Sequence, residues 1–378
     1  MQNAGNWIGF WMALLLGLTG ISEGKPMPAP KTESVRSYTI TENDTTVYVL
    51  HLSLDGAGQP AYFYRNVFTP VCLTGECKPV YINFYWDLLG NYTRFDFPPG
   101  EELTKMDHKP FKPEDYEKLQ TILANTNSLF RQVAMDDLVG KGTENLADSV
   151  DAKAGATLKT VKNEVIEGAV YTCYTLWHIA HGKVVNEMQR ITESYRSEAL
   201  LHRFMTSTNH HYQYWALDRV LGPGGQVPPT FAADVQGLIR GKNVFTARYA
   251  LQKVAPDFWN TPERQRWLWD TYLKAGYTLQ LAILKKLTTT RLLPTLTEPM
   301  AGHLPNANPE QFTLLLNLLA AQPALSEKTQ LAMAGQLSGS NPDYTARIYQ
   351  LLTSQRPKNR AVQAQMARFQ SKPVQPQH

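Results

Sequence analysis

The sequence predicts an N-terminal α+β domain built on an antiparallel sheet, followed by an all-α domain of helical repeats. Three observations lead to this fold class. Between residues 37 and 97, β-branched and aromatic residues form short runs separated by turn residues. From about residue 194, apolar residues recur at helical spacing, and similar segments return at a constant interval. The chain of 378 residues also exceeds the usual size of one domain.

The composition is that of a folded protein without a nucleic-acid partner. Hydrophobic residues make up 43% of the chain and charged residues 19%, which suits a globular protein. The formal net charge is only +4, and no basic stripe is interleaved with stacking aromatic residues. We therefore expect no nucleic-acid binding.

The N-terminus predicts an export signal. An apolar run covers residues 7–21, and Ser22 and Gly24 are small residues where a signal peptidase inspects the chain. The run is shorter than the roughly 20 residues that cross a bilayer, which favours a cleaved signal over a retained anchor. We expect a signal peptide over residues 1–24, a linker over 25–36, and an exported protein, periplasmic or extracellular, with no membrane span after cleavage.

The N-terminal domain is assigned to residues 37–185 and should contain four strands with local connections. The expected strands are residues 46–53, 61–69, 80–87 and 92–97. Short connections between consecutive strands predict an antiparallel sheet. A polar loop then leads to a helix that begins at Pro113 and carries Glu114 and Asp115 in its first turn.

A turn of small residues precedes the next expected helix. Gly155 and Ala156 lead to Thr157, which we place in the first turn of that helix. Its apolar face is predicted from residues spaced by four, which are Val161, Val165, Ala169 and Cys173. The Thr157 hydroxyl has two interpretations: it caps the free backbone N–H groups, or it stands beside a phosphate that those N–H groups and the helix dipole hold.

The segment Asp151-Ala-Lys-Ala-Gly-Ala-Thr157 resembles the Asp-x-x-Ser/Thr-Gly-Ala-Thr box of FMN-binding domains, such as those of sodium-pumping quinone reductases. In that family a flavin transferase joins the last threonine to the FMN phosphate through a phosphoester bond, and the corresponding residue here is Thr157. Asp151, Gly155 and Ala156 also match, whereas Ala154 stands where the family usually has a hydroxyl residue. The resemblance implies FMN as cofactor, attached through Thr157 or held without a covalent bond.

Three residues outside the box are candidate flavin contacts. Lys105 and His108 lie in the polar loop before Pro113, where they either contact the flavin or belong to a solvated loop. Tyr171 follows the box and either covers the flavin ring or packs in the core. No metal site is expected.

The cysteines are interpreted from the predicted export. Cys72 and Cys77 flank a short turn, and in an oxidising compartment a local disulfide between them is the expected state. Cys173 lies on an apolar helix face and is expected to be a buried free thiol.

The second half of the chain has a repeat of 33 to 40 residues. Residues 215–220 align with residues 249–254 at an offset of 34, and the similar segments that begin at Thr246 and Thr345 are 99 residues apart. A helix pair repeated at this interval resembles degenerate HEAT-type repeats; a compact helical bundle is the alternative. The expected pairs are 196–205 with 211–221, 230–239 with 243–254, 262–274 with 278–287, and 309–320 with 327–337, followed by 344–353. The repeat domain is assigned to residues 186–355, and residues 356–378 are expected to form a helical or disordered tail.

Two functions follow from these observations. The first is an exported electron-transfer protein that carries FMN at Thr157 as the flavin-bearing component of an oxidoreductase system, with a flavin transferase and a redox partner protein as its partners. The second is a non-enzymatic exported scaffold whose helical repeats bind a protein partner. No sequence motif of a hydrolase or of a dinucleotide-binding site is found.

Overall fold

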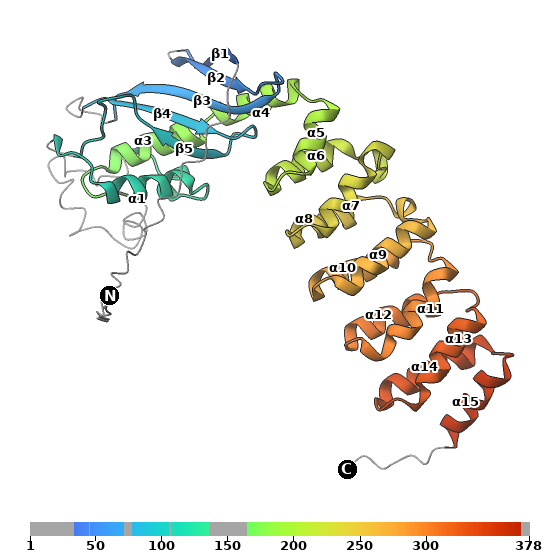
Figure 1. Ribbon diagram of the computed structural model, residues 1–378. Coiled ribbons are helices and arrows are strands. Elements are labelled where there is room, and N and C mark those ends of the chain that lie inside the picture. The colour runs from blue at the N-terminus through green and yellow to red at the C-terminus, as the bar shows by residue number, and fades with distance from the viewer. Residues whose placement is uncertain (1–33, 45, 72–77, 106–107, 136–164, 372–378) are drawn as a thin grey trace, which may run out of the picture.

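The computed structural model describes residues 34–44, 46–71, 78–105, 108–135 and 165–371 and has the predicted fold class (Figure 1). A five-stranded antiparallel sheet with helices forms the N-terminal part, and an arc of helices forms the rest. The first part contains β1 (Ser34–Asn43), β2 (Thr46–Leu54), β3 (Pro60–Thr69), β4 (Val80–Trp86), β5 (Tyr92–Asp96), α1 (Pro113–Ala124), the 3₁₀ helix η2 (Leu129–Arg131), α3 (Val170–His181) and α4 (Val184–Ser194).

The arc contains α5 (Glu198–Met205), α6 (His210–Val220), α7 (Ala232–Arg240), α8 (Val244–Lys253), α9 (Pro262–Lys274), α10 (Tyr277–Leu287), α11 (Pro294–His303), α12 (Pro309–Ala320), α13 (Glu327–Ala334), α14 (Pro342–Gln355) and α15 (Arg360–Gln370). Short 3₁₀ helices connect them, namely η5 (Pro223–Gly225), η6 (Pro229–Phe231), η7 (Pro256–Trp259), η8 (Leu304–Asn306) and η9 (Gly335–Ser338).

The strands follow one another in space in the order β1-β2-β3-β4-β5, each antiparallel to its neighbour. Alternate side chains of each strand point to opposite faces, and one face is buried under α1 and α3 (Figure 1). Leu50, Phe63 and Phe84 on this face are fully buried, whereas Val47 and Tyr81 on the other face are exposed. The core therefore lies between the sheet and these helices.

The structure adds β1 to the four expected strands. It begins at Ser34, so the last residues of the expected linker belong to the sheet. Only Ile40 of this strand is buried, because β1 is an edge strand with one neighbour. Its many polar residues gave no clear alternation of apolar and polar positions, which is why the sequence did not reveal it.

The helix that follows the FMN-like box begins later than predicted. We expected Val165, Ala169 and Cys173 on one helical face, but α3 begins at Val170, and residues 165–169 form a turn. Gly168 has φ +72° there. This value lies in the left-handed region, which glycine adopts readily and which interrupts an α-helix. The prediction of one helix running from Thr157 past Cys173 is therefore wrong.

The arc consists of antiparallel helix pairs that stack on their neighbours. α5 packs on α6, α7 on α8, α9 on α10, α11 on α12 and α13 on α14. The second helices of these pairs, α6, α8, α10, α12 and α14, lie along the inner side of the arc (Figure 1). Asn and Ser side chains start many of the helices as N-caps, for example Asn209, Asn243 and Asn341.

The offset of 34 residues seen in the sequence has a structural counterpart. The guanidinium carbon of Arg219 lies 3.8 Å from the ring centroid of Trp215 on α6. On α8 the ammonium nitrogen of Lys253 lies 5.2 Å from the ring centroid of Tyr249. The same cation–π contact is thus made at matching positions of two consecutive inner helices.

One helix of the array was missed, and the pairing after it was therefore wrong. α11 contains Pro299 in its interior and Gly302 near its end, which are poor helix residues, so we expected α12 to pair with α13. In the structure α11 pairs with α12, and α13 pairs with α14.

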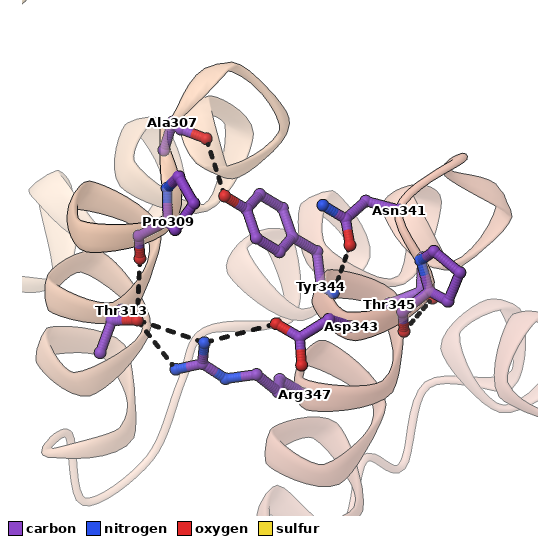
Figure 2. A network of polar contacts seen from close by, with 9 residues as sticks. Ala307, Pro309, Thr313, Asn341, Asp343, Tyr344, Thr345 and Arg347 are labelled. Atoms are coloured by element: carbon purple, nitrogen blue, oxygen red, sulfur yellow. Dashed lines mark hydrogen bonds and ion pairs between the residues drawn. The ribbon is translucent and has the colours of Figure 1, made fainter.

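Side chains join consecutive pairs, as the contacts between α12 and α14 show (Figure 2). Arg347 donates from both terminal nitrogens to Thr313 Oγ1 at 3.2 Å. Tyr344 donates to the carbonyl of Ala307 at 3.2 Å, and its ring stacks on Phe312 with centroids 3.7 Å apart. Each pair thus contacts its neighbours directly, as in a linear repeat array.

Several predictions concern residues outside the described part. These are the signal peptide, the FMN-box residues Asp151, Gly155, Ala156 and Thr157, and the cysteines Cys72 and Cys77. The expected domain boundary after residue 185 falls within α4. Within the described segments, no helix combines the length and the apolar character needed to cross a membrane.

Candidate functional site

The helix after the FMN-like box is fixed by polar aromatic side chains that bind backbone carbonyls. His181 Nε2 lies 2.8 Å from the carbonyl of Leu123, in the last turn of α1, and Trp177 Nε1 donates to the carbonyl of Asn125 at 2.8 Å. His178 Nε2 lies 3.0 Å from the carbonyl of Phe130. Because a carbonyl only accepts, both histidines carry the proton on Nε2. These carbonyls lack helical partners, so Trp177, His178 and His181 on α3 have a structural role.

Burial is the main influence on the pKa values of the two histidines on α3. It lowers the pKa of His178 and of His181, although the hydrogen bonds to the carbonyls act in the opposite direction. Cys173 on the same helix is a buried free thiol, as expected, and burial raises its pKa to about 12. These groups are thus held neutral and suit packing better than acid–base chemistry. No cluster of three potential metal ligands occurs among the described residues.

The three candidate flavin contacts outside the box lie in different settings. The ammonium of Lys105 lies 2.9 Å from the carboxylate of Asp115 in the first turn of α1. Burial alone would raise the pKa of Asp115, but hydrogen bonds from Lys105 and the Lys112 N–H lower it. His108 is exposed with φ +57°, and Tyr171 is half-buried in the first turn of α3. Lys105 therefore already has a counter-charge that fixes the start of α1.

The arc carries a groove between α8 and α10, with a volume of about 670 Å³. A second pocket of about 540 Å³ shares Tyr277 and Thr278 with it and extends to the turns between α7 and α8 and between α9 and α10. We call the two together the inner groove. Its lining includes Tyr214, Arg240, Lys242, Phe245, Arg248, Tyr249, Lys274, Tyr277, Leu281, Lys285 and Lys286.

Aromatic side chains of the inner groove are unusually open to solvent. Phe245 on α8 is 67% exposed and Tyr277 on α10 is 48% exposed. The rings of Tyr214 and Tyr249 meet edge to face, with centroids 4.9 Å apart. Large exposed aromatic residues gathered in a concave region are typical of a binding surface.

The charge of the inner groove is positive. Arg240, Lys242, Arg248, Lys274, Lys285 and Lys286 line it, and no described residue that lines it is Asp or Glu. Two nearby carboxylates are already engaged, because Tyr249 donates to Asp218 at 2.6 Å and Tyr277 donates to Glu310 at 2.5 Å. The hydrogen bond with Asp218 raises the pKa of Tyr249 to about 12. Lys285 also lies 3.9 Å from Glu310.

Lys286 differs from the other lysines of the groove because it is buried. Its ammonium donates to the carbonyl of Val254 at 2.6 Å, and burial lowers its pKa. Val254 ends α8, so this contact fixes α10 against α8. The groove walls are thereby held together by the protein itself.

Sequence reasoning did not find the inner groove. Phe245 and Tyr277 occupy apolar-looking helix positions, and their exposure follows only from the stacking of α8 on α10. Comparisons with protein-family models, with curated proteins and with solved structures give no match to this chain.

Proposed function

We propose that the protein is a non-enzymatic adaptor whose helical repeats bind an extended segment of a partner protein in the inner groove. One observation carries this proposal: a concave, cationic groove that exposes Phe245 and Tyr277. Binding energy at protein interfaces concentrates in aromatic and arginine side chains near the centre of the contact. Phe245, Tyr277 and Arg248 provide such side chains on two adjacent helices.

The chemistry of the groove indicates what the partner segment contains. Exposed rings favour apolar or aromatic side chains on the partner, and a lining with five exposed cations and no carboxylate favours acidic residues. We therefore propose an acidic peptide segment with interspersed aromatic or aliphatic residues. Its binding weakens as salt is added, because exposed charges are screened.

Selection of random displayed peptides on the full-length protein tests this function. We expect the selected peptides to be acidic and to contain aromatic or aliphatic residues. Fluorescence anisotropy of one such peptide should show about tenfold weaker binding to the Phe245→Ser variant and to the Arg248→Ser variant, the loss typical of a central contact.

Leu331→Ser is the matched control, since Leu331 is also an exposed apolar side chain, 40% exposed, but lies on α13 in the other row of helices. It should leave the affinity unchanged. Peptides without an acidic bias, or equal binding to the Phe245→Ser and wild-type proteins, would refute the groove as the partner site.

A second candidate function is electron transfer by FMN carried at Thr157. It is supported by the resemblance of residues 151–157 to the FMN box and by the order of elements around it, in which β1–β5 and α1 precede the box and α3 follows. In this role the flavin supplies the redox chemistry, and the protein provides position and surroundings.

Co-expression with a flavin transferase tests the second candidate. We expect yellow protein whose flavin fluorescence remains with the denatured chain, with loss of that fluorescence in Thr157→Val and retention in the neighbouring control Thr160→Val. Colourless protein would reject flavin binding. Flavin that separates from the chain on denaturation would reject the covalent bond alone.

A further inference from the structure

Arg65 occupies a position where the sheet would be expected to carry an apolar side chain. It lies on β3 between Phe63 and Val67, at the same phase of the strand, and both of these residues are buried. Since alternate residues share a face, Arg65 points to the side covered by the helices. Its Nε is buried and has no hydrogen-bond partner, and Arg65 forms no ion pair within the part of the chain that the structure describes.

Two more polar groups around Arg65 are also unsatisfied. The guanidinium carbon lies 3.6 Å from the ring centroid of Tyr48 on β2. Tyr48 is only 8% exposed, and its hydroxyl has no partner. Thr175 Oγ1 on α3 is likewise buried without a partner. Buried polar groups in native proteins are nearly always hydrogen-bonded, so these three groups mark a region whose polar atoms the chain itself does not satisfy.

A pocket of about 600 Å³ opens beside these groups, between the ends of β1, β2 and β3 and the helices α3 and α4. Arg65 and Thr175 line it, and Lys183 adds a second cationic side chain. Met135 and Ile179 provide apolar side chains in the lining. The volume lies within the range of roughly 300–1,000 Å³ that is usual for small-molecule sites.

The charges around the pocket favour an anion. Arg65 and Lys183 are cationic, and Glu42 is the carboxylate in the lining. Glu187 also acts on Tyr48 from α4, but its carboxylate is bound by Arg190 at 2.8 Å. Burial lowers the pKa of Arg65, while Tyr48 and Glu42 oppose that effect. A guanidinium removed from water without a full counter-charge is stabilised by an oxoanion that accepts two of its hydrogen bonds.

We propose that this pocket binds a small organic oxoanion, either a carboxylate or a phosphate monoester. Its oxygens accept hydrogen bonds from the terminal nitrogens of Arg65, and its apolar body packs against Met135 and Ile179. This site is separate from the inner groove of the repeats and does not depend on the adaptor function.

Isothermal titration calorimetry on the full-length protein with benzoate, phenyl phosphate and inorganic phosphate tests the site. We expect benzoate or phenyl phosphate to bind with one-to-one stoichiometry and more tightly than inorganic phosphate, which lacks an apolar body. The tighter of the two aromatic probes identifies the oxoanion as a carboxylate or a phosphate. Arg65→Met should weaken that binding at least tenfold, whereas Arg94→Met is the control, because Arg94 is exposed and contacts Tyr85 rather than the pocket.

Two further variants keep the test decisive if Arg65→Met fails to fold. Arg65→Lys retains the charge but loses the forked donor geometry, so binding should weaken several-fold. Glu42→Gln removes the competing carboxylate and should tighten binding. The site is refuted if neither aromatic probe binds the wild-type protein, or if replacement of Arg65 leaves affinity unchanged.

Discussion

Replacing Trp86 by Ala is expected to destabilise the sheet domain by about 3–5 kcal/mol, the usual cost of removing a buried Trp or Phe side chain. Trp86 is fully buried at the end of β4, and its ring stacks on Phe84 with centroids 5.6 Å apart. Its Nε1 also donates to the carbonyl of Ala180 at 2.8 Å, in the last turn of α3. The variant thus loses packing and leaves a buried carbonyl without its donor. A loss of this size is a large share of the roughly 5–15 kcal/mol that stabilises a typical domain.

Hydrogen exchange of β4 peptides in rising urea measures this loss without interference from the helical array. Exchange in the Trp86→Ala variant should accelerate at lower urea than in the wild-type protein. Tyr81→Ala is the matched control, because Tyr81 lies on the same strand but is 40% exposed on the opposite face. It should change stability by less than about 0.5 kcal/mol. Equal effects of the two substitutions would contradict the assignment of Trp86 to the core contact with α3.

Gln265→Leu should have the second-largest effect. Gln265 on α9 is 1% exposed, and both ends of its amide bind the backbone that leads into α11. Its Nε2 donates to the carbonyl of Arg291 at 2.7 Å, and its Oε1 accepts from the N–H of Leu293 at 2.9 Å. Leucine has a similar size but cannot make either bond. Each backbone group left unsatisfied costs roughly 1–3 kcal/mol.

The amide of Leu293 provides a local readout for this prediction. Its exchange with solvent should be faster in Gln265→Leu, and the urea midpoint of the helical signal should fall. Gln252→Leu replaces an exposed glutamine on α8 and should change neither quantity. A protected Leu293 amide together with an unchanged midpoint would show that Gln265 does not connect α9 to the next repeat.

The sequence alone predicted those strands and helices in which the alternation or the helical spacing of apolar residues was strong. The apolar phase of β2, β3 and β4 predicted the sheet, and Pro113 predicted the start of α1. The failures have local causes. β1 is a polar edge strand, Gly168 ends the expected helical run before α3, and Pro299 hides α11. In each case packing in the folded chain overrode a weak local preference.

The candidate sites were less accessible to sequence reasoning. The inner groove combines Arg248 with Lys285, and only the stacking of α8 on α10 brings such distant residues together. Arg65 could have been noticed, because a charged residue interrupts the apolar phase of Phe63 and Val67 along a strand. The surroundings of Arg65, however, depend on the positions of Tyr48, Thr175 and Glu42, which come from three other elements.

Because each helix pair of the arc packs on its immediate neighbours, the arc is a linear series of contacts between adjacent pairs. A partner segment bound between α8 and α10, as proposed above, would act on one of these contacts, and any change in its angle would shift the helix pairs beyond it, as far as α15. The displacement would grow with the length of the array beyond the groove. Under that proposal, binding in the groove would alter the distance between the sheet domain and α15.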